Sequence, residues 1–410
     1  RPRSWCDGST NRSLIESMRM ERIELHRVRP TRFPKDSSSN AFECGRRALP
    51  GRSTLGSNSA SSTADFSPAN PLVQPDDIAA WLGALQPPVA LTGGTGFVGS
   101  HLVDTLCGAG LRPRVLVRNA GNPRWIAGVD ADWIEGSLEE PASLRRLVDG
   151  AGTVVHLAGV LRAGRESEFD EGNRQGTANL VSAVRDAAPK ARLVHVSSLA
   201  AAGPSPEPEG RAPDDPPAPI SAYGRSKLGG ENEVAALGDA RCWCILRPPA
   251  VYGPRDTDIF EFFKMASKGL AAIPAGERWL TMVYVADVVR AVLAAAAVGA
   301  PGAIYHLGEP SPQRLDAIFQ QLASGGAGRV RIIRVPPAII RAAGAAGSAL
   351  QRMGLRRWPL TGDKATELLA SHWTAKTVSS HDALGLGTGT IFAQGAQATW
   401  RWYRLMRWLR

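Results

Sequence analysis

Short runs rich in Val, Ile and Leu alternate along the chain with longer stretches whose apolar residues recur at helical spacing. The runs lie at 89–93, 114–118, 153–159, 192–198 and 242–248. Helical spacing is clear between them, at 100–110 and 176–188. Strands that alternate with helices predict a parallel sheet covered by helices on both faces, the doubly wound α/β class.

The alternation becomes irregular after residue 248. Further helices are expected at 260–270, 286–298 and 363–371. We therefore predict a sheet domain at 76–248 and a smaller C-terminal, substrate-side region at 249–410, with some of its segments returning to the sheet. No apolar run reaches the roughly 18 residues that a membrane-spanning helix needs, so no such helix is predicted.

Residues 1–75 differ in composition from the rest of the chain. Ser, Arg, Pro and Asn are frequent there, and no helical or strand period persists. Such a segment buries too little apolar surface to offset the entropy of ordering, so a disordered basic extension is predicted. No apolar segment follows the opening arginines, so a secretory signal is not expected.

The charge and the cysteines narrow the classes of function. The chain carries 48 Lys and Arg against 38 Asp and Glu, a net charge of +10. Residues 76–399 hold 32 basic and 31 acidic residues, so the surplus lies at the two ends and disfavours a nucleic-acid-binding body. The five cysteines include no CxxC pair, so we expect no metal site and a reducing, cytoplasmic location.

A glycine-rich turn, TGGTGFVG, follows the first predicted strand and opens the first helix. Gly93, Gly96 and Gly99 would allow a tight turn, close approach of a pyrophosphate, and close packing of helix on strand. Phe97 and Val98 begin the helix, whose free N–H groups and positive dipole end would face the phosphates. In this context the motif predicts dinucleotide binding and a Rossmann-type sheet.

The choice between the two nicotinamide cofactors depends on the second predicted strand. An acid at its end would bind the ribose 2′-hydroxyl and favour NAD, but the strand ends at Arg118. A cation there suits a 2′-phosphate, so NADP is preferred over NAD; the alternative is a solvated charge. Ser137 and Leu138 stand where a segment contacting the adenine should follow the third strand.

A second motif, YGRSK, places Tyr223 and Lys227 four residues apart on one helix face. An ammonium there would lower the pKa of the phenol from about 10 toward neutrality and make it usable as an acid or base. Ser198 precedes them, at the carboxyl end of a predicted parallel strand, where open sheets place their ligands.

With these motifs the sequence resembles the extended short-chain dehydrogenase/reductases, also called the NAD-dependent epimerase/dehydratase family. The resemblance covers about residues 88–409. It rests on TGGTGFVG (92–99), HLAG (156–159), NRQGTANL (173–180), VSS (196–198), YGRSK (223–227), RPPAVYGPRD (247–256) and VYVADVVRA (283–291). The resemblance implies that Tyr223 transfers the proton of the substrate oxygen. It also implies that Lys227 binds the nicotinamide ribose and that Ser198 hydrogen-bonds the substrate oxygen.

The resemblance implies further roles for residues near the fourth strand. Asn173 matches the family's asparagine in the helix beside the cofactor, and we count it with the catalytic set. Ala158 and Gly159 would let the strand end lie against the cofactor. For two other residues we expect structural roles: His156 as a buried strand position and Asp287 as a helix cap.

Departures from the family's subgroups bear on the substrate. Within the family that this chain resembles, nucleotide-sugar 4,6-dehydratases carry an acidic pair just after the catalytic Ser or Thr. Ser198 is followed by Leu and three Ala, so dehydration is disfavoured. Leu280 stands about where epimerases carry a diphosphate-binding arginine, although Arg278 could substitute. The chain looks closest to the dihydroflavonol-reductase and 3β-hydroxysteroid-dehydrogenase branches, which act on bulky apolar alcohols or ketones. The Pro-rich segment 203–222 is interpreted as a lid over the substrate or as a long surface loop.

The sequence thus favours an NADP-preferring oxidoreductase that interconverts a secondary alcohol and a ketone. The alternatives are a nucleotide-sugar epimerase that retains NAD, and a cofactor-binding scaffold without turnover. The expected partner is a small-molecule substrate, and a homodimer stays open. The arginine- and tryptophan-rich residues 400–410 could form an amphipathic helix on a membrane surface, but we favour a closing helix packed on the protein.

Overall fold

The protein is described by a computed structural model that covers residues 75–119, 125–126, 128–238, 241–326, 328–353 and 360–409. The extension predicted at 1–75 lies, up to residue 74, outside the described residues. Its predicted disorder therefore stays a prediction.

A seven-stranded parallel sheet, ordered β11-β6-β5-β4-β1-β2-β3, forms the centre of the fold. Its strands are β1 (Val89–Thr92), β2 (Arg114–Val117), β3 (Asp132–Glu135), β4 (Thr153–His156), β5 (Arg192–Val196), β6 (Trp243–Arg247) and β11 (Ala303–His306). Every neighbouring pair is parallel. The parallel α/β sheet predicted from the sequence is confirmed, and its strand order reverses between β1 and β4.

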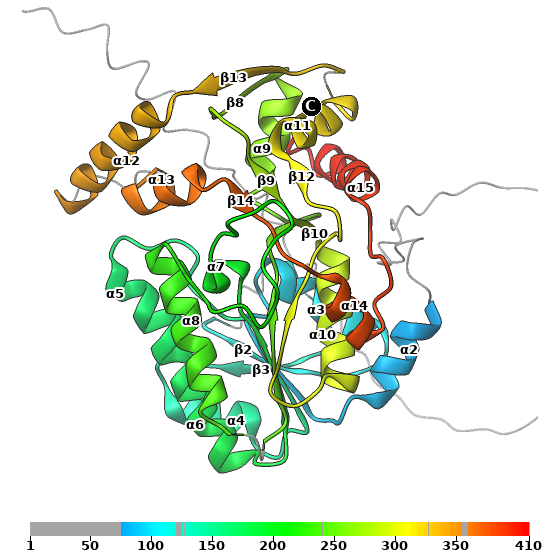
Figure 1. Ribbon diagram of the computed structural model, residues 1–410. Coiled ribbons are helices and arrows are strands. Elements are labelled where there is room, and N and C mark those ends of the chain that lie inside the picture. Colours follow the sequence, from blue (N-terminus) through cyan, green and yellow to red (C-terminus); the bar gives the residue numbers. More distant parts are fainter. Residues whose placement is uncertain are drawn as a thin grey trace, which may run out of the picture. The chain divides into compact units, whose positions relative to one another are not determined.

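Helices cover both faces of this sheet (Figure 1). One face is covered by α4 (Pro141–Val148), α6 (Gly176–Ala187) and α8 (Ala222–Ala235), and the other by α2 (Pro75–Ala84), α3 (Phe97–Gly108) and α10 (Val285–Val298). Leu144, Leu180 and Val234 are fully buried on the first face. Leu102 and Val292 are buried on the second. Two apolar layers therefore hold the sheet, as alternating buried strands and amphipathic helices require.

The remaining elements form three small sheets with their own helices. The strands are β7 (Ala250–Tyr252), β8 (Leu270–Pro274), β9 (Trp279–Leu280), β10 (Met282–Tyr284), β12 (Gln313–Arg314), β13 (Arg331–Val335) and β14 (His372–Trp373). The helices are α9 (Phe260–Ser267), α11 (Leu315–Ser324), α12 (Pro337–Arg352), α13 (Gly362–Leu369), α14 (Val378–Leu384) and α15 (Phe392–Leu405). Strand β11 follows residue 248 in the sequence but pairs with β6, so a segment of the C-terminal region returns to the central sheet. The domain boundary at residues 248 and 249 stays a prediction.

The C-terminal segment differs from the continuous helix expected at 400–410. Helix α15 ends at Leu405, and Arg407 adopts a φ of 58°. The chain then folds back, so that the amide of Trp408 donates to the carbonyl of Tyr403 at 2.8 Å. Trp400 is only 2% exposed and packs in the core with Phe263. This agrees with the packed closing helix that the sequence favoured over a membrane-bound one.

The Pro-rich segment 203–222 is attached to the strand region before α14. The amide of Ser205 donates to the carbonyl of His372, and that of Arg211 donates to the carbonyl of Thr374. Gly210 lies close to Ala375: a Cβ on Gly210 would be 2.6 Å from the amide nitrogen of Ala375. The segment is thus held at defined points.

Among the described residues, no helix is long and apolar enough to cross a bilayer.

Candidate active site

The glycine turn lies at the carboxyl end of β1, where the strand order of the sheet reverses. Gly93 has a φ of +74°, and a Cβ there would lie 2.6 Å from the amide nitrogen of Ala158 at the end of β4. Gly96 precedes α3, and its amide donates to the carbonyl of Gly93 at 3.0 Å. A Cβ on Gly99 would overlap that same carbonyl oxygen. The turn is therefore a tight cradle with no room for side chains.

Helix α3 starts at Phe97 and Val98, directly after this cradle. No side chain caps its first turn, so the amides there are free for an anionic ligand. The positive end of the helix dipole and the free amides attract a pyrophosphate, and the absence of side chains at the glycines lets it approach the backbone. The residues present therefore fit a dinucleotide.

We expect Gly99→Ala to abolish dinucleotide binding, because its methyl group must displace the turn or the helix. Gly108 in the same helix is the matched control, since a Cβ there meets no described atom within 4 Å. Gly108→Ala should leave binding unchanged and stability equal or slightly higher. Fluorescence titration with NADPH and NADH measures both variants. Equal binding by both would contradict the role of the cradle.

The segment after β3 is held against α6. Leu138 accepts a hydrogen bond from Asn179 Nδ2 through its carbonyl, at 2.8 Å, and a Cβ on Gly176 would lie 2.8 Å from Leu138 Cδ1. Ser137 Oγ accepts from the amide of Glu139 at 3.3 Å. These contacts fix the segment that the sequence assigns to the adenine side.

An open cavity of about 480 Å³ lies beside that segment. Its lining residues are Arg118, Glu135, Gly136, Ser137, Glu140 and Arg146. Arg118 is exposed at the end of β2, as expected, and Arg146 is a second cation in the lining, which the sequence analysis missed. Two arginines and two glutamates share the cavity, so its charge is mixed.

Ser198 and Tyr223 come together after β5 ends at Val196. Ser198 precedes the short helix α7 (Leu199–Ala202), and its Oγ accepts from the amide of Ala200 at 3.1 Å. Tyr223 is the second residue of α8, whose start is capped by Ser221. The hydroxyl of Ser198 lies near enough to the phenol of Tyr223 to lower its pKa in part. The pair predicted from sequence spacing is therefore one contact in the fold.

Lys227 is buried one turn after Tyr223 and points to the same sheet edge. Its Nζ donates to the carbonyl of Val196 at 3.0 Å. Burial lowers the pKa of Lys227 to about 8, and the charge of Glu231 opposes this shift. A Cβ on Gly159 would lie 3.8 Å from the Lys227 Nζ, so the lysine borders the end of β4.

The pKa of Tyr223 differs from the sequence expectation. Burial raises the pKa to about 12, while the nearby hydroxyl of Ser198 lowers it in part. Lys227 was expected to move this pKa toward neutrality, and that expectation is wrong for the chain alone. The reason is that desolvation of the phenolate outweighs the other effects.

Asn173 lies in a π-helical segment, η1 (Asp170–Gln175), which follows α5 (Glu166–Phe169). Its Oδ1 accepts from the amide of Val160 at 2.7 Å, and its Nδ2 donates to the Val160 carbonyl at 3.0 Å. The same Nδ2 donates to Ser226 Oγ at 2.9 Å. The asparagine side chain thus joins the loop after β4 to the helix that carries Tyr223.

A buried hydrogen-bonded chain runs from the glycine turn to this asparagine. Thr177 Oγ1 donates to the carbonyl of Asn173 at 2.5 Å and so accepts from His156 Nε2 at 2.9 Å. His156 Nδ1 then accepts from Thr92 Oγ1 at 2.6 Å, and Thr92 Oγ1 accepts from the amide of Ala158 at 3.2 Å. Burial and the charge of Lys227 lower the pKa of His156 to about 3, so the ring stays neutral.

The structural role expected for His156 agrees with this burial, but its partners Thr92 and Thr177 were missed. Thr92 opens the motif TGGTGFVG and Thr177 lies within NRQGTANL, but no sequence spacing connects the two threonines with His156. Asp287 needs a correction. Tyr284, not Asp287, precedes α10 at the capping position, and no side chain caps the helix.

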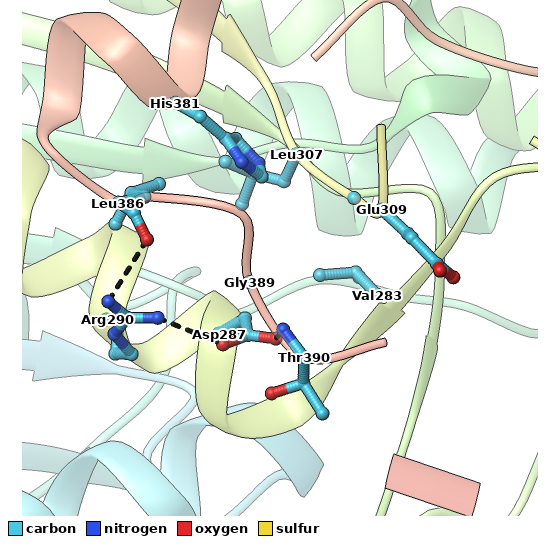
Figure 2. Close-up of a pocket in the computed structure, with 10 residues that line it drawn as sticks. Val283, Asp287, Arg290, Leu307, Glu309, His381, Leu386, Gly389 and Thr390 are labelled. Carbon is cyan, nitrogen blue, oxygen red and sulfur yellow. Dashed lines mark hydrogen bonds and ion pairs between the residues drawn. The ribbon is translucent and has the colours of Figure 1, made fainter. Parts of the chain in front are cut away.

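Asp287 instead ties α10 to the segment before α15. Figure 2 shows it between Arg290 and Thr390 at the edge of a small cavity. Its carboxylate accepts from the amide of Thr390 at 2.7 Å and from Arg290 at 3.3 Å. None of the predicted site residues lines this cavity, so it is separate from the candidate site.

The described residues include no cluster of three or more His, Cys, Asp or Glu that could hold a metal ion.

The parallel sheet, the glycine cradle and the clustered Ser, Tyr and Lys define a Rossmann-fold enzyme class that works with a nicotinamide dinucleotide. The model of the NAD dependent epimerase/dehydratase family matches residues 89–308. The chain belongs to this family, whose members are the extended short-chain dehydrogenase/reductases.

Two characterised relatives are reductases. Ceramide reductase of Caulobacter vibrioides is 33% identical over 329 residues, which cover 78% of this chain and 96% of that protein. The 4-hydroxy-2-methyl-3-oxo-4-farnesyl-3,4-dihydroquinoline-1-oxide ketoreductase of Stigmatella aurantiaca is 28% identical over 269 residues, which cover 64% of this chain and 80% of that protein.

A solved structure shows the same fold. The dTDP-glucose 4,6-dehydratase DesIV of Streptomyces venezuelae, with NAD bound, superposes with a TM-score of 0.63 and 23% identity. The match covers 78% of this chain and 97% of that one. At this identity the likeness concerns the fold alone.

Proposed function

We propose that this protein is an NADP-preferring oxidoreductase that interconverts a secondary alcohol and a ketone bearing a bulky apolar group. The observation that carries the proposal is the convergence of Ser198, Tyr223 and Lys227 at the sheet edge beside the glycine cradle. Proton transfer and oxyanion stabilisation both need such groups at one place. An arrangement of this kind also argues against a scaffold without turnover.

The cofactor would be held by three parts of the chain. The turn from Gly93 to Gly99 would bind the pyrophosphate, the backbone at Ala158 and Gly159 would lie along it, and Lys227 would bind the nicotinamide ribose. When bound, the reduced cofactor supplies a hydride to the carbonyl carbon of the ketone. Asn173 and the hydrogen-bonded chain through His156 would fix these backbone segments, so we assign Asn173 as a positioning residue.

The protein's own side chains would manage the oxygen of the substrate. Ser198 Oγ donates a hydrogen bond to the ketone oxygen, and Tyr223 Oη donates its proton as the alcohol forms. With its pKa raised to about 12, Tyr223 is protonated at neutral pH and is ready for the reduction direction. The reaction balances as ketone, reduced cofactor and one proton giving alcohol and oxidised cofactor.

The environment after Ser198 supports reduction over water elimination. Residues Leu199–Ala202 form α7 and are buried, so they offer no acid or base next to the serine. The names of both reductases reported above refer to compounds with long apolar chains, a ceramide in one and a farnesylated quinoline oxide in the other. We therefore assign a ketone with a long apolar chain as the substrate class.

The preference for NADP rests on Arg118 in the cavity beside β2 and β3. A guanidinium there would pair with a 2′-phosphate but gains nothing from a 2′-hydroxyl. We expect Arg118→Ala to weaken NADPH binding at least about tenfold, the scale of one charge-assisted contact, and NADH binding much less. Arg146→Ala is the companion variant on the same cavity. Equal losses for both cofactors would make Arg118 a structural charge.

A substrate screen with NADPH fluorescence tests the proposed function. Long-chain ketones in mild detergent should consume NADPH, whereas nucleotide sugars should not. An enzyme purified with tightly held NAD that interconverts nucleotide sugars would instead establish the epimerase alternative. If NADPH binds but is consumed with neither class of compound, the cofactor-binding scaffold without turnover would be favoured.

A further inference from the structure

Helix α12 packs on the rest of the protein through one narrow face. Ile340, Gly344 and Gly347 are its buried residues, at helical spacing. Gly344 lets the helix approach α13 closely, since a Cβ there would lie 2.7 Å from the Cβ of Ala365. Figure 1 shows α12 at the edge of the described fold, beside α13. The side of α12 opposite these residues is exposed.

The open face of α12 is apolar, which is unusual for a peripheral helix. Ile339 is 57% exposed and Met353, just after the helix, is 69% exposed. Five exposed or half-exposed alanines, at 338, 342, 345, 346 and 349, fill the surface between them and the basic flank. That flank carries Arg341 and Arg352. We call this set, from residue 338 to residue 353, the α12 surface.

The charge of this part of the chain has one sign. Residues 317–362 contain seven arginines and not one Asp or Glu. Arg334 is paired with Asp316 on α11, but among the described residues Arg341 makes no ion pair. A face of alanine, isoleucine and methionine flanked by unpaired arginines matches the interface of an anionic bilayer, where cations meet lipid phosphates and apolar groups enter the headgroup boundary.

We propose that the α12 surface docks the protein on anionic phospholipid bilayers. Its occupant is the lipid surface, because its arginines complement lipid phosphates and its exposed apolar residues, Ile339, Met353 and the alanines, can enter the headgroup boundary. A second copy of this chain would bring like charges together at the same face. The proposal does not depend on the reaction assigned above.

The docked helix would lie next to the candidate active site. Gln351 Nε2 donates to the carbonyl of Ala163 at 3.3 Å, in the loop between β4 and α5. On α13, the carboxylate of Asp363 accepts from the amide of Ala222 at 2.9 Å, one residue before Tyr223. Docking through α12 would therefore hold the site close to the membrane, where long-chain apolar molecules reside.

The C-terminal segment offers a matched comparison. It is also rich in arginine, but Trp400 and Tyr403 are buried, so most of its aromatic surface is not available to lipid. Arg401 and Arg407 are exposed there, as Arg341 and Arg352 are on α12. Reversing two charges at each place changes the net charge equally and separates a local surface from a general electrostatic effect.

The test is flotation of the full chain with vesicles of phosphatidylcholine, with and without phosphatidylglycerol, at low salt. We expect binding only with phosphatidylglycerol, and weakening as salt is added. Arg341→Glu with Arg352→Glu should lower the bound fraction at least about tenfold, and Ile339→Glu should lower it further. Arg401→Glu with Arg407→Glu should lower it much less. Circular dichroism and NADPH titration would verify that the variants are folded.

Three results would overturn the proposal. The first is an equal loss for the two double variants, and the second is binding that does not depend on phosphatidylglycerol. The third is a dimer in light scattering that the α12 double variant dissociates, since that would assign the surface to a second copy. Turnover of a short, water-soluble ketone should be unchanged in the α12 variants, which keeps this test separate from that of the proposed function.

Discussion

Replacing Tyr223 with Phe is expected to lower turnover by at least about 100-fold, the usual scale for a positioned acid, and to leave NADPH binding nearly intact. The phenol lies near the hydroxyl of Ser198 and is protonated at neutral pH, so its loss removes the proton donor without removing cofactor contacts. Single-turnover oxidation of NADPH with a ketone substrate measures the effect.

Tyr305→Phe is the matched control for this variant. Its hydroxyl accepts from the amide of Ala300 at 2.8 Å, away from the candidate site. The control loses one hydrogen bond and should cost stability on the order of 1 kcal/mol, with turnover retained. A Tyr223→Phe enzyme that keeps most of its activity would remove Tyr223 from the mechanism.

The second large effect is an expected loss of folding stability as the pH falls. His156, His195, His306 and His381 are buried and His101 is half-buried, and burial lowers the pKa of all five, to about 3 for His156 and about 4 for His101 and His306. In the unfolded chain a histidine titrates near pH 6.5. Below that pH the unfolded state binds protons that the folded state does not bind, so stability is lost as the pH falls.

Three carboxyls act in the opposite sense, since burial raises the pKa values of Glu309 and Asp363 as well as that of Asp256. Burial raises the pKa of Asp256 to about 7, so the folded state holds a proton there that the unfolded state releases. Five histidines outnumber three carboxyls, so the unfolded state binds more protons overall, and each unbalanced proton lowers the free energy of unfolding by about 1.4 kcal/mol per pH unit between about pH 6 and pH 5. Since folded proteins have only about 5–15 kcal/mol of stability, this loss should be a sizeable share of the total near pH 5.

Urea unfolding at a series of pH values measures this slope. His306→Asn keeps a donor for the carbonyl of Arg211, to which His306 Nδ1 bonds at 3.1 Å, and removes one titrating ring. Its slope between pH 6 and pH 5 should be shallower by about 1.4 kcal/mol per pH unit. Near pH 8 wild type and variant should have the same slope. A flat profile between pH 6 and pH 5 would contradict neutral buried histidines.

Features encoded in short sequence segments could be predicted well. The strands around 89–93 and 192–198, the glycine turn and the position of Ser198 follow from local pattern, because strand alternation and turn chemistry act over a few residues. The place of Ser198 at the ligand-binding edge could be inferred because parallel strands place their carboxyl ends at one sheet edge, and the shared helix face of Tyr223 and Lys227 could be inferred from their spacing of four residues.

Features that depend on packing could not be predicted. The burial of Trp400 follows from its contact with Phe263 and from the chain reversal after Leu405, neither of which the arginine pattern contains. The raised pKa of Tyr223 depends on how completely the fold excludes water from the phenol. Asp287 was misassigned because its partner, Thr390, lies about a hundred residues away in the sequence.

The most direct measurement of the central claim follows the hydride itself. NADPH deuterated at carbon 4 of the nicotinamide is supplied with a long-chain ketone, such as the ketone formed by oxidising a ceramide alcohol, and the product is analysed by mass spectrometry. We expect one deuterium on the new alcohol carbon, one NADPH consumed per alcohol formed, and loss of the reaction in Tyr223→Phe. An enzyme that leaves the ketone unchanged but inverts a nucleotide sugar, with no deuterium taken from added NADPH, would contradict it.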